Sequence, residues 1–250
     1  PPALHNADWL ALDVVLNMGL TAERLAKAAG ISRVVMDALA LSSHQRAANA
    51  DAAGHFAGER LTLNNAAGEP ISADSNIRAD TSSERLAGLD PVFMQGGAVT
   101  AGNSSPLTSG AAATLLMSEP ALHQHGISPL ARVVAIADCG VKPEEMGAGA
   151  AAAIQRALKQ AQLTPEDISL WEINEAFAAV PLHAMGELSL PPENVNIWGG
   201  AMALGHPLGA TGIRLAGTLA RQLQHRQQRY GCAAACIGGG QGIAIILERC

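Results

Sequence analysis

The sequence lacks the features that mark a membrane-spanning or nucleic-acid-binding protein. No apolar run approaches the roughly 20 residues that a helix needs to cross a bilayer, and no block of lysine or arginine stands out. The formal net charge is −6 over 250 residues, so the surface offers nucleic acid little attraction. We therefore expect no membrane span and no nucleic-acid partner, and any basic residues that bind an anionic ligand must act locally.

Cysteine is also scarce. The four cysteines are irregularly spaced, and no C-x-x-C pair occurs: Cys139, Cys232, Cys236 and Cys250. This pattern disfavours both a disulfide framework and a zinc site. His123 and His125 are better interpreted as part of a surface loop before Gly126 than as metal ligands. We therefore expect a reducing, cytoplasmic compartment and no metal.

The chain does not begin with Met, and its first residues have neither the basic nor the apolar stretch of a secretory signal. We expect no signal peptide here and a natural start that lies upstream.

The first third of the chain is expected to be helical and then irregular. Thr21 is expected to cap a helix that runs to Ala29, and Ser32 to cap a longer helix that runs to about Ala50. Residues 51–91 are broken up by turn-forming residues, which predicts a loop-rich excursion.

The remainder alternates between β-rich and helical patterns. A short strand is expected at 98–101, and residues 110–117 are expected to form an apolar helix or a buried segment. Further strands are expected at 130–137, 170–173, 195–198, 232–237 and 243–247, and further helices at 150–163, 176–185 and 210–225. Strands that alternate with helices predict an α/β layered fold.

Three segments that follow expected strands are candidates for a site. The first is Asn174-Glu175-Ala176-Phe177. The Asn174 amide there either holds a water or donates a hydrogen bond to a ligand, or else it caps the helix that follows. Taken alone, the segment favours the capping role.

The second segment spans residues 199–212 and is rich in glycine. His206 lies between Gly205 and Pro207, immediately before an expected helix whose N-terminus favours a neutral imidazole. A histidine with a purely structural role usually needs no such set of glycines, so this segment favours a functional role.

The third segment, residues 236–242, places Cys236 next to three consecutive glycines. Their backbone N–H groups are unobstructed by side chains, which suits an oxyanion hole for a thioester. Cys236 is either a reactive thiol or a buried cysteine before an ordinary hairpin, and the segment alone does not decide between them.

Together, these segments resemble the signatures of the thiolase family in their order and spacing. They match the N-E-A-F, G-H-P and C-x-G-G-G-x-G boxes, and the similarity runs from about residue 12 to the end. Further similar segments are residues 18–23, 43–45, 100–105, 110–113 and 146–149. The resemblance implies an α/β, thiolase-like layered α-β-α-β-α fold with an incomplete N-terminal half.

The resemblance also implies a division of the chain. Residues 1–97 would be a remnant of the N-terminal half, mostly its coenzyme A-binding loop excursion. Residues 98–128 would hold the last strand and helix of that half, and residues 129–250 would form the C-terminal thiolase domain.

The roles of four residues follow from the resemblance. His206 would activate the nucleophilic cysteine of the family and help to form an oxyanion hole. Cys236 would be the general acid/base, Asn174 would hold a water in the enolate's oxyanion hole, and Gly238 would supply a backbone donor to the other one. The resemblance further implies that acyl-CoA and CoA are partners and that no other cofactor is needed. The residues expected to bind CoA or its acyl group are Met18, Arg78, Ala101, Ser105, Leu107, Met146 and Phe177.

The family's nucleophile, a cysteine in an upstream C-x-S turn, has no counterpart here. Cys139 differs in position and context. We therefore expect thiolysis or condensation of acyl-CoA by the natural protein but not by this chain alone, which would expose an open sheet edge and apolar surface. A homodimer or homotetramer is expected, with a separate N-terminal fragment as a further partner to consider. The alternative is a non-catalytic acyl-CoA-binding or subunit-type relative, against which the intact Asn174, His206 and Cys236 argue.

Overall fold

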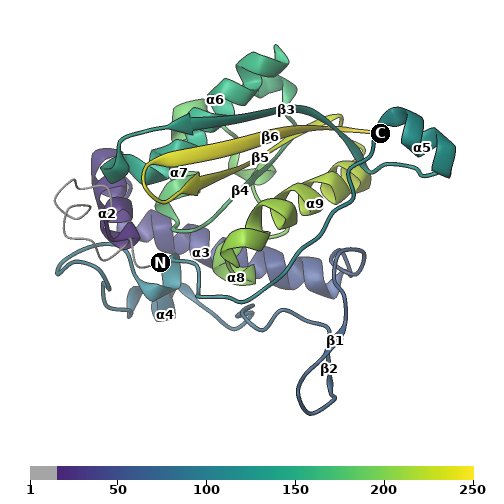
Figure 1. The fold of residues 1–250 in the computed structure, drawn as a ribbon. Coiled ribbons are helices and arrows are strands. Elements are labelled where there is room, and N and C mark those ends of the chain that lie inside the picture. Colours follow the sequence, from purple (N-terminus) through teal and green to yellow (C-terminus); the bar gives the residue numbers. More distant parts are fainter. Residues whose placement is uncertain (1–15) are drawn as a thin grey trace, which may run out of the picture.

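The computed structural model describes residues 16–250, so the first fifteen residues of the expected N-terminal remnant lie outside it. One four-stranded sheet organises the second half (Figure 1). Its strands, in spatial order, are β3 (Ala131–Gly140), β6 (Gln241–Arg249), β5 (Tyr230–Ile237) and β4 (Leu170–Ile173). β6 is antiparallel to both β3 and β5, whereas β4 and β5 are parallel.

Helices lie on both faces of this sheet and bury β4, whereas alternate side chains of β3 and β6 are exposed. α9 (Leu208–Arg226) packs on one face, where Leu215, Leu219 and Leu223 meet Leu170 of β4. The next residue of β4, Trp171, points to the other face. The apolar cluster on that face includes residues of α6 (Gly149–Ala161) and α7 (Ala179–Leu188). This alternation of side chains is what a strand covered on both sides requires. The expected α/β layering of the second half is confirmed.

Two helices from the first half pack beneath this core. α2 (Met18–Ala28) packs against α7 and the 3-10 helix η3 (Pro143–Ala148), and α3 (Arg33–Ala52) packs against the short α8 (Ala201–Leu204). The prediction that Ser32 caps α3 is confirmed, because its hydroxyl accepts a hydrogen bond from the Val35 N–H at 3.4 Å.

The prediction that Thr21 caps α2 is wrong. Asn17 is the cap, and its side-chain oxygen accepts from the Gly19 N–H at 2.9 Å. Thr21 lies inside the first turn, where its hydroxyl donates to the Met18 carbonyl at 2.7 Å. Both residue types are good caps, and only the position of the first hydrogen-bonded turn separates them.

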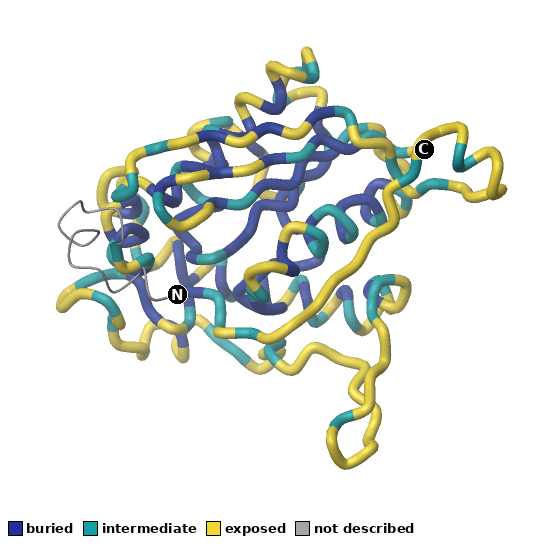
Figure 2. The backbone as a smooth tube through the Cα atoms, in the orientation of Figure 1, coloured by how far each residue is buried: buried dark blue, intermediate teal, exposed yellow. Residues whose placement is uncertain are grey.

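Residues 53–128 contain little regular structure, as expected for 51–91. A two-stranded hairpin, β1 (Leu63–Asn64) and β2 (Pro70–Ile71), projects from the body and is exposed (Figures 1 and 2). The other elements are α4 (Ser83–Ala87), the 3-10 helix η2 (Ala101–Asn103) and α5 (Glu119–His125).

Two predictions for this region are wrong. The strand expected at 98–101 is reduced to a single bridge between Pro91 and Thr100, followed directly by η2. The helix or buried segment expected at 110–117 is an extended and mostly exposed chain, because nothing among the described residues covers it. His123 and His125 lie in the exposed last turn of α5 rather than in a loop.

Two predictions in the second half also need correction. The strand expected at 195–198 is a single parallel bridge between Val195 and Trp171, preceded by the 3-10 helix η5 (Pro192–Asn194). The helix expected from residue 176 begins at Ala179, which puts Pro181 in its first turn, where the missing N–H costs no hydrogen bond. Another 3-10 turn, η4 (Pro165–Asp167), precedes β4.

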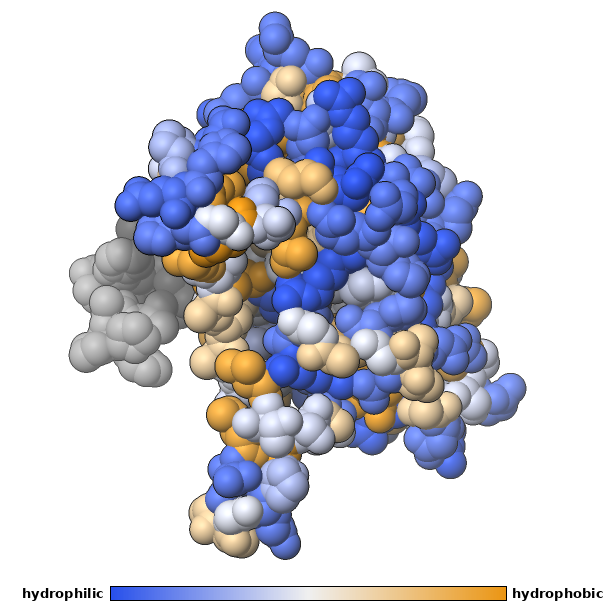
Figure 3. All heavy atoms as spheres, turned by 90° about the vertical axis from the view of Figure 1, so that its right-hand side faces the viewer, coloured by the Kyte–Doolittle hydropathy of each residue, from blue (hydrophilic) through white to orange (hydrophobic). Residues whose placement is uncertain are grey.

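Apolar side chains are exposed along the extended segment 105–118. Leu107, Leu115 and Leu116 all lie in solvent. Figure 3, which views the side that carries α5, shows apolar side chains gathered between larger hydrophilic areas. Within residues 16–250, no helix is both long and apolar enough to cross a membrane.

Candidate functional site

Asn174 and Cys236 lie at the same edge of the sheet. The Asn174 N–H donates to the Ala234 carbonyl at 2.9 Å and so continues the parallel pairing of β4 with β5. Cys236 stands two residues further along β5, just before the turn of Gly238, Gly239 and Gly240. The carboxyl ends of neighbouring parallel strands are where α/β sheets place their sites.

Glu175 anchors the segment that leads to His206. Its carboxylate accepts hydrogen bonds from the Ser43 hydroxyl at 2.6 Å, the Asn196 amide at 2.8 Å and the Met202 N–H at 3.1 Å. A Cβ on Gly200 would overlap this carboxylate, so only glycine fits there. No role was predicted for Glu175 from the sequence. Its only signal in the sequence was a carboxylate directly after an apolar strand.

His206 faces Asn174 across the site. Its Nε2 lies 3.4 Å from the Asn174 amide nitrogen, and its Nδ1 lies 2.7 Å from the Thr211 hydroxyl. Burial, and secondarily the charge of Arg214, lower the pKa of His206 below its usual value of 6.5. The imidazole is therefore neutral at neutral pH, as expected from the sequence. Gly205 adopts a φ of +97°, a conformation that favours glycine at this turn.

The Cys236 thiol is held in its protonated form. Burial raises its pKa to about 12, so the thiol is a proton donor rather than a base in this environment. Cys139 lies two strands away and pairs with Gly242, the same residue that pairs with Cys236. The Cys139 thiol donates to the Gly149 carbonyl at 3.3 Å, and both cysteines are free.

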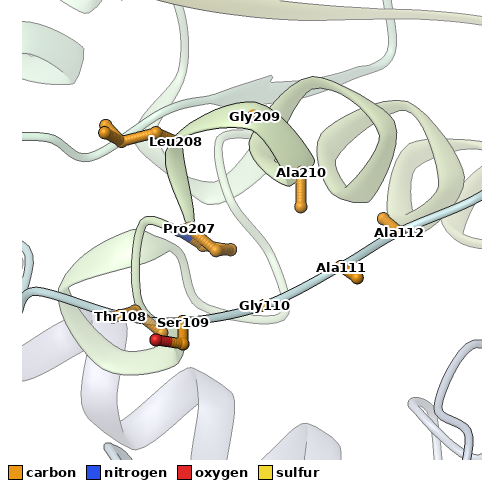
Figure 4. Close-up of a pocket in the computed structure, with 9 residues that line it drawn as sticks. All are labelled: Thr108, Ser109, Gly110, Ala111, Ala112, Pro207, Leu208, Gly209 and Ala210. Atoms are coloured by element: carbon orange, nitrogen blue, oxygen red, sulfur yellow. The ribbon is translucent and has the colours of Figure 1, made fainter. Parts of the chain in front are cut away.

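A cavity of about 320 Å³ opens beside His206. It is lined by His206, Leu208 and residues 105–109. A larger and shallower hollow of about 500 Å³ adjoins it, where the extended residues 108–112 run alongside Pro207–Ala210 at the start of α9 (Figure 4). Thr108, Ser109 and Leu208 line both spaces.

Several residues expected to bind CoA lie around this edge. Ser105 and Leu107 line the same cavity as His206. Met18 lies close to the glycine turn, since a Cβ on Gly238 would be 3.3 Å from its sulfur. Met146, Phe177 and Cys236 belong to one apolar cluster, against which Met18 packs.

Two of the expected residues lie apart from the cavity. Ala101 is exposed in η2. Arg78 is also exposed, and its backbone N–H donates to His44 Nδ1 of α3 at 3.1 Å.

The grouped side chains offer a defined set of chemical functions. The imidazole of His206 is neutral, the thiol of Cys236 is protonated, and the glycine turn of residues 238–240, whose backbone N–H groups have no side chains beside them, follows the strand of Cys236. Asn174 contributes an amide whose oxygen is buried and accepts no hydrogen bond from the described residues. This set can move protons and stabilise a developing oxyanion, which are the requirements of acyl transfer. Within residues 16–250, no cluster of three or more His, Cys, Asp or Glu is placed to hold a metal ion.

Comparison with known proteins identifies the family. Residues 8–120 match the N-terminal domain of thiolase and residues 127–249 match its C-terminal domain. The chain belongs to the thiolase family. An acetyl-CoA acetyltransferase from Chromobacterium violaceum is 46% identical over 237 residues, which cover 93% of this chain and 60% of that protein.

Solved structures agree with this assignment. A crystal structure of the Bacillus anthracis acetyl-CoA acetyltransferase is similar with a TM-score of 0.91 and 42% identity, over 94% of this chain and 60% of that one. The human mitochondrial 3-ketoacyl-CoA thiolase in complex with CoA gives a TM-score of 0.87 and 40% identity, over 94% and 59%. The expected thiolase fold is confirmed, and the chain spans about 60% of the length of these relatives.

Proposed function

We propose that this protein catalyses acyl transfer between coenzyme A thioesters through a cysteine acyl-enzyme. The reaction is either thiolysis of a 3-ketoacyl-CoA or Claisen condensation of acetyl-CoA. The observation that supports it most is the contact between Asn174 and His206 at the edge of the sheet where the strand of Cys236 ends. The names of the relatives, an acetyl-CoA acetyltransferase and a 3-ketoacyl-CoA thiolase, fit both directions.

The neutral His206 is the group that accepts the proton of the nucleophilic thiol and later donates to the thioester oxygen. The Gly238 N–H supports the oxyanion of the tetrahedral intermediate, and Asn174 supports the enolate. Cys236, whose thiol is protonated, delivers a proton to the enolate that leaves in cleavage. In condensation it must first lose that proton, which requires stabilisation of its thiolate by the bound substrates.

None of the four cysteines stands in the C-x-S turn that the family resemblance implies for the nucleophile. We propose that this nucleophile belongs to a segment outside these 250 residues, either of the same protein or of a partner chain. The hollow beside Pro207–Ala210 supports this proposal, because it adjoins the cavity of His206 and is open to a further segment.

CoA is proposed as a substrate, with no other cofactor. Ser105 and Leu107 are proposed to contact its pantetheine arm, which their place beside His206 supports. Ala101 and Met146 are proposed as further contacts, with Met18 beside the glycine turn and Phe177 against the acyl group. The exposed guanidinium of Arg78 is proposed to meet the phosphates. A homodimer or homotetramer, a cytoplasmic location and a role in fatty-acid metabolism complete the proposal by analogy with the family.

The test uses the protein in its complete natural form and measures thiolysis of acetoacetyl-CoA by CoA. His206→Asn should lower kcat by about 10²–10⁴-fold, because it removes the proton-transfer group. His123→Asn, on the exposed α5, is the matched control and should leave kcat unchanged.

The same assay separates the alternative functions. A non-catalytic relative would bind CoA in calorimetry but give no turnover even in its complete form. Residues 1–250 alone should bind CoA at most weakly and show no turnover. Steady turnover by that isolated chain would overturn the proposal that the nucleophile lies outside it.

A further inference from the structure

One face of α9 carries a line of polar side chains into the protein interior. Thr211, Arg214, Thr218 and Gln222 are spaced three or four residues apart, so they share one side of the helix. The two threonines and Gln222 are buried, and the Arg214 side chain is only 17% exposed. Buried polar groups are costly unless they are hydrogen-bonded, so each of these side chains is expected to have a polar partner.

The partners of these side chains are acidic residues of β4 and of the loop after α3. The Gln222 amide donates to Glu172 of β4 at 2.7 Å, and the Thr218 hydroxyl donates to Glu59 at 3.0 Å. Glu172 is fully buried, and burial raises its pKa to about 8, although Arg214 and Gln222 oppose this shift. Glu172 is therefore mostly protonated at neutral pH.

Arg214 is the positively charged residue among these acidic side chains. Its Nη1 lies 3.9 Å from the Glu172 carboxylate, and none of its three guanidinium nitrogens donates a hydrogen bond to the described residues. The acidic groups that its charge reaches are Glu59, Glu172 and Glu175, and burial raises the pKa of each of them. No hydrogen bond joins the guanidinium to any of these carboxyls, so its positive charge has no directly bonded partner among the described residues.

Arg214 lies one helical turn from the residue that contacts His206. Thr211, which contacts His206 Nδ1, precedes Arg214 by three residues on the same face of α9. Arg214 is the charged group whose field reaches the ring, and its effect adds to that of burial. A buried charge without a hydrogen-bonded partner is costly, so fold stability does not explain an arginine at this position.

We propose that Arg214 is a positioning residue for His206 that, together with Thr211, holds the imidazole neutral with its proton on Nδ1 and with Nε2 open toward Asn174. In this tautomer the Nδ1–H donates to the Thr211 hydroxyl, 2.7 Å away, and Nε2 faces the Asn174 amide nitrogen at 3.4 Å. The positive charge of Arg214 disfavours a second proton on the ring. This role rests on the proposed acyl-transfer function, since it keeps Nε2 ready to accept a thiol proton.

The test compares three variants of the protein in its complete natural form. Arg214→Gln removes the charge, Arg214→Lys retains it, and Arg221→Gln removes a charge from the same helix near Gly58, away from the histidine. NMR of labelled imidazole gives the pKa and tautomer of His206 directly, and the acid limb of the pH profile of kcat/KM gives the kinetic counterpart.

Arg214→Gln should raise the pKa of His206 by about half a unit or more and move the acid limb by the same amount. Arg214→Lys and Arg221→Gln should leave both where they are. Thr211→Val, a second variant that retains the charge, should shift the neutral ring toward the Nε2–H form.

Equal pKa values of His206 in the parent and in Arg214→Gln would overturn the proposal, as would a parent ring already protonated on Nε2. Should Arg214→Gln not fold, the tautomer in Thr211→Val decides, because a ring that keeps its proton on Nδ1 in that variant would overturn the proposal. Because NMR reads the ring without turnover, an absence of thiolase activity would count against the proposed function alone.

Discussion

Residues 129–250 and residues 53–128 of this chain differ in how they are covered. In the first region, helices on both faces of the sheet bury β4 and most of β5, although Ile136 of β3 and Ile243 of β6 are exposed. α9 and α6 follow the expected boundaries within a few residues. In the second, Leu107, Leu115 and Leu116 lie in solvent along an extended chain. Residues 110–117 are rich in alanine and leucine, which favour helix, yet they form none. Short helices are marginal without packing, so the difference shows that a covering layer, not local propensity, decides the structure here.

The strongest way to break this comparison is a matched pair of truncations. Leu219, on α9, is 0% exposed, whereas Leu116 is 77% exposed. Leu219→Ala should lower the free energy of unfolding by about 2–5 kcal/mol through a cavity between α9 and the sheet. Leu116→Ala should change it by less than about 0.5 kcal/mol.

Urea unfolding of the protein in its complete natural form measures both values. A large loss from Leu116→Ala would mean that the extended segment is covered in that form. It would then contradict the view that this region lacks a packing partner.

A smaller effect should appear in the pH dependence of stability. Because the folded-state pKa of Glu172 is raised to about 8 from 4.5, the folded protein retains a proton that the unfolded chain has lost between these values. Glu172 therefore lowers the free energy of unfolding as pH rises through this window. Glu172→Gln should flatten that decline, as urea unfolding at pH 5.5, 7 and 8.5 would show.

Glu248→Gln is the control for this measurement, since Arg132 and Arg229 hold the pKa of the Glu248 carboxyl below its usual range. Its contribution is present above pH 4.5 and is lost as pH falls further. A slope between pH 5.5 and 8.5 that is the same in Glu172→Gln and in the parent would show that Glu172 is not held protonated by the fold.

The smallest expected effect compares two helix caps. Ser32 caps the 20-residue α3 within the packed body, and Ser82 caps the five-residue α4 in the irregular region. Ser32→Ala should cost about 1 kcal/mol of global stability. Ser82→Ala should instead increase local hydrogen exchange at Arg85 with little effect on global unfolding. Equal global losses would mean that both regions unfold as one cooperative unit.

The sequence predicted what depends on pattern and motif. The layers of the second half followed from the alternation of apolar strands and helices, and Asn174, His206 and Cys236 stood out by their glycine-rich surroundings. Residues 195–198 looked like a strand because of their apolar composition, but only Val195 pairs with the sheet. The local sequence pattern does not indicate how many of these residues form hydrogen bonds with the edge strand of the sheet.

Other features depend on contacts between distant parts of the chain. Glu175 meets Ser43 across 132 residues, and Arg214 meets Glu172 from a different layer. No periodicity in one segment encodes such a pairing, so these two residues were not singled out from sequence. The same holds for the pKa of Cys236, which results from burial by surrounding elements.

The shared register of Cys139 and Cys236 opposite Gly242 has a consequence for oxidative damage. The two cysteines stand on strands separated by β6, so their Cα atoms are about 9–10 Å apart, beyond the roughly 7 Å limit for a disulfide. An oxidant that reaches the Cys236 sulfur therefore finds no neighbouring thiol in β3 with which the sulfenic acid could condense. The sulfenic acid can then be rescued only by a thiol from outside these residues, either the proposed nucleophile when it occupies the site or a small cellular thiol, before it advances to irreversible acids.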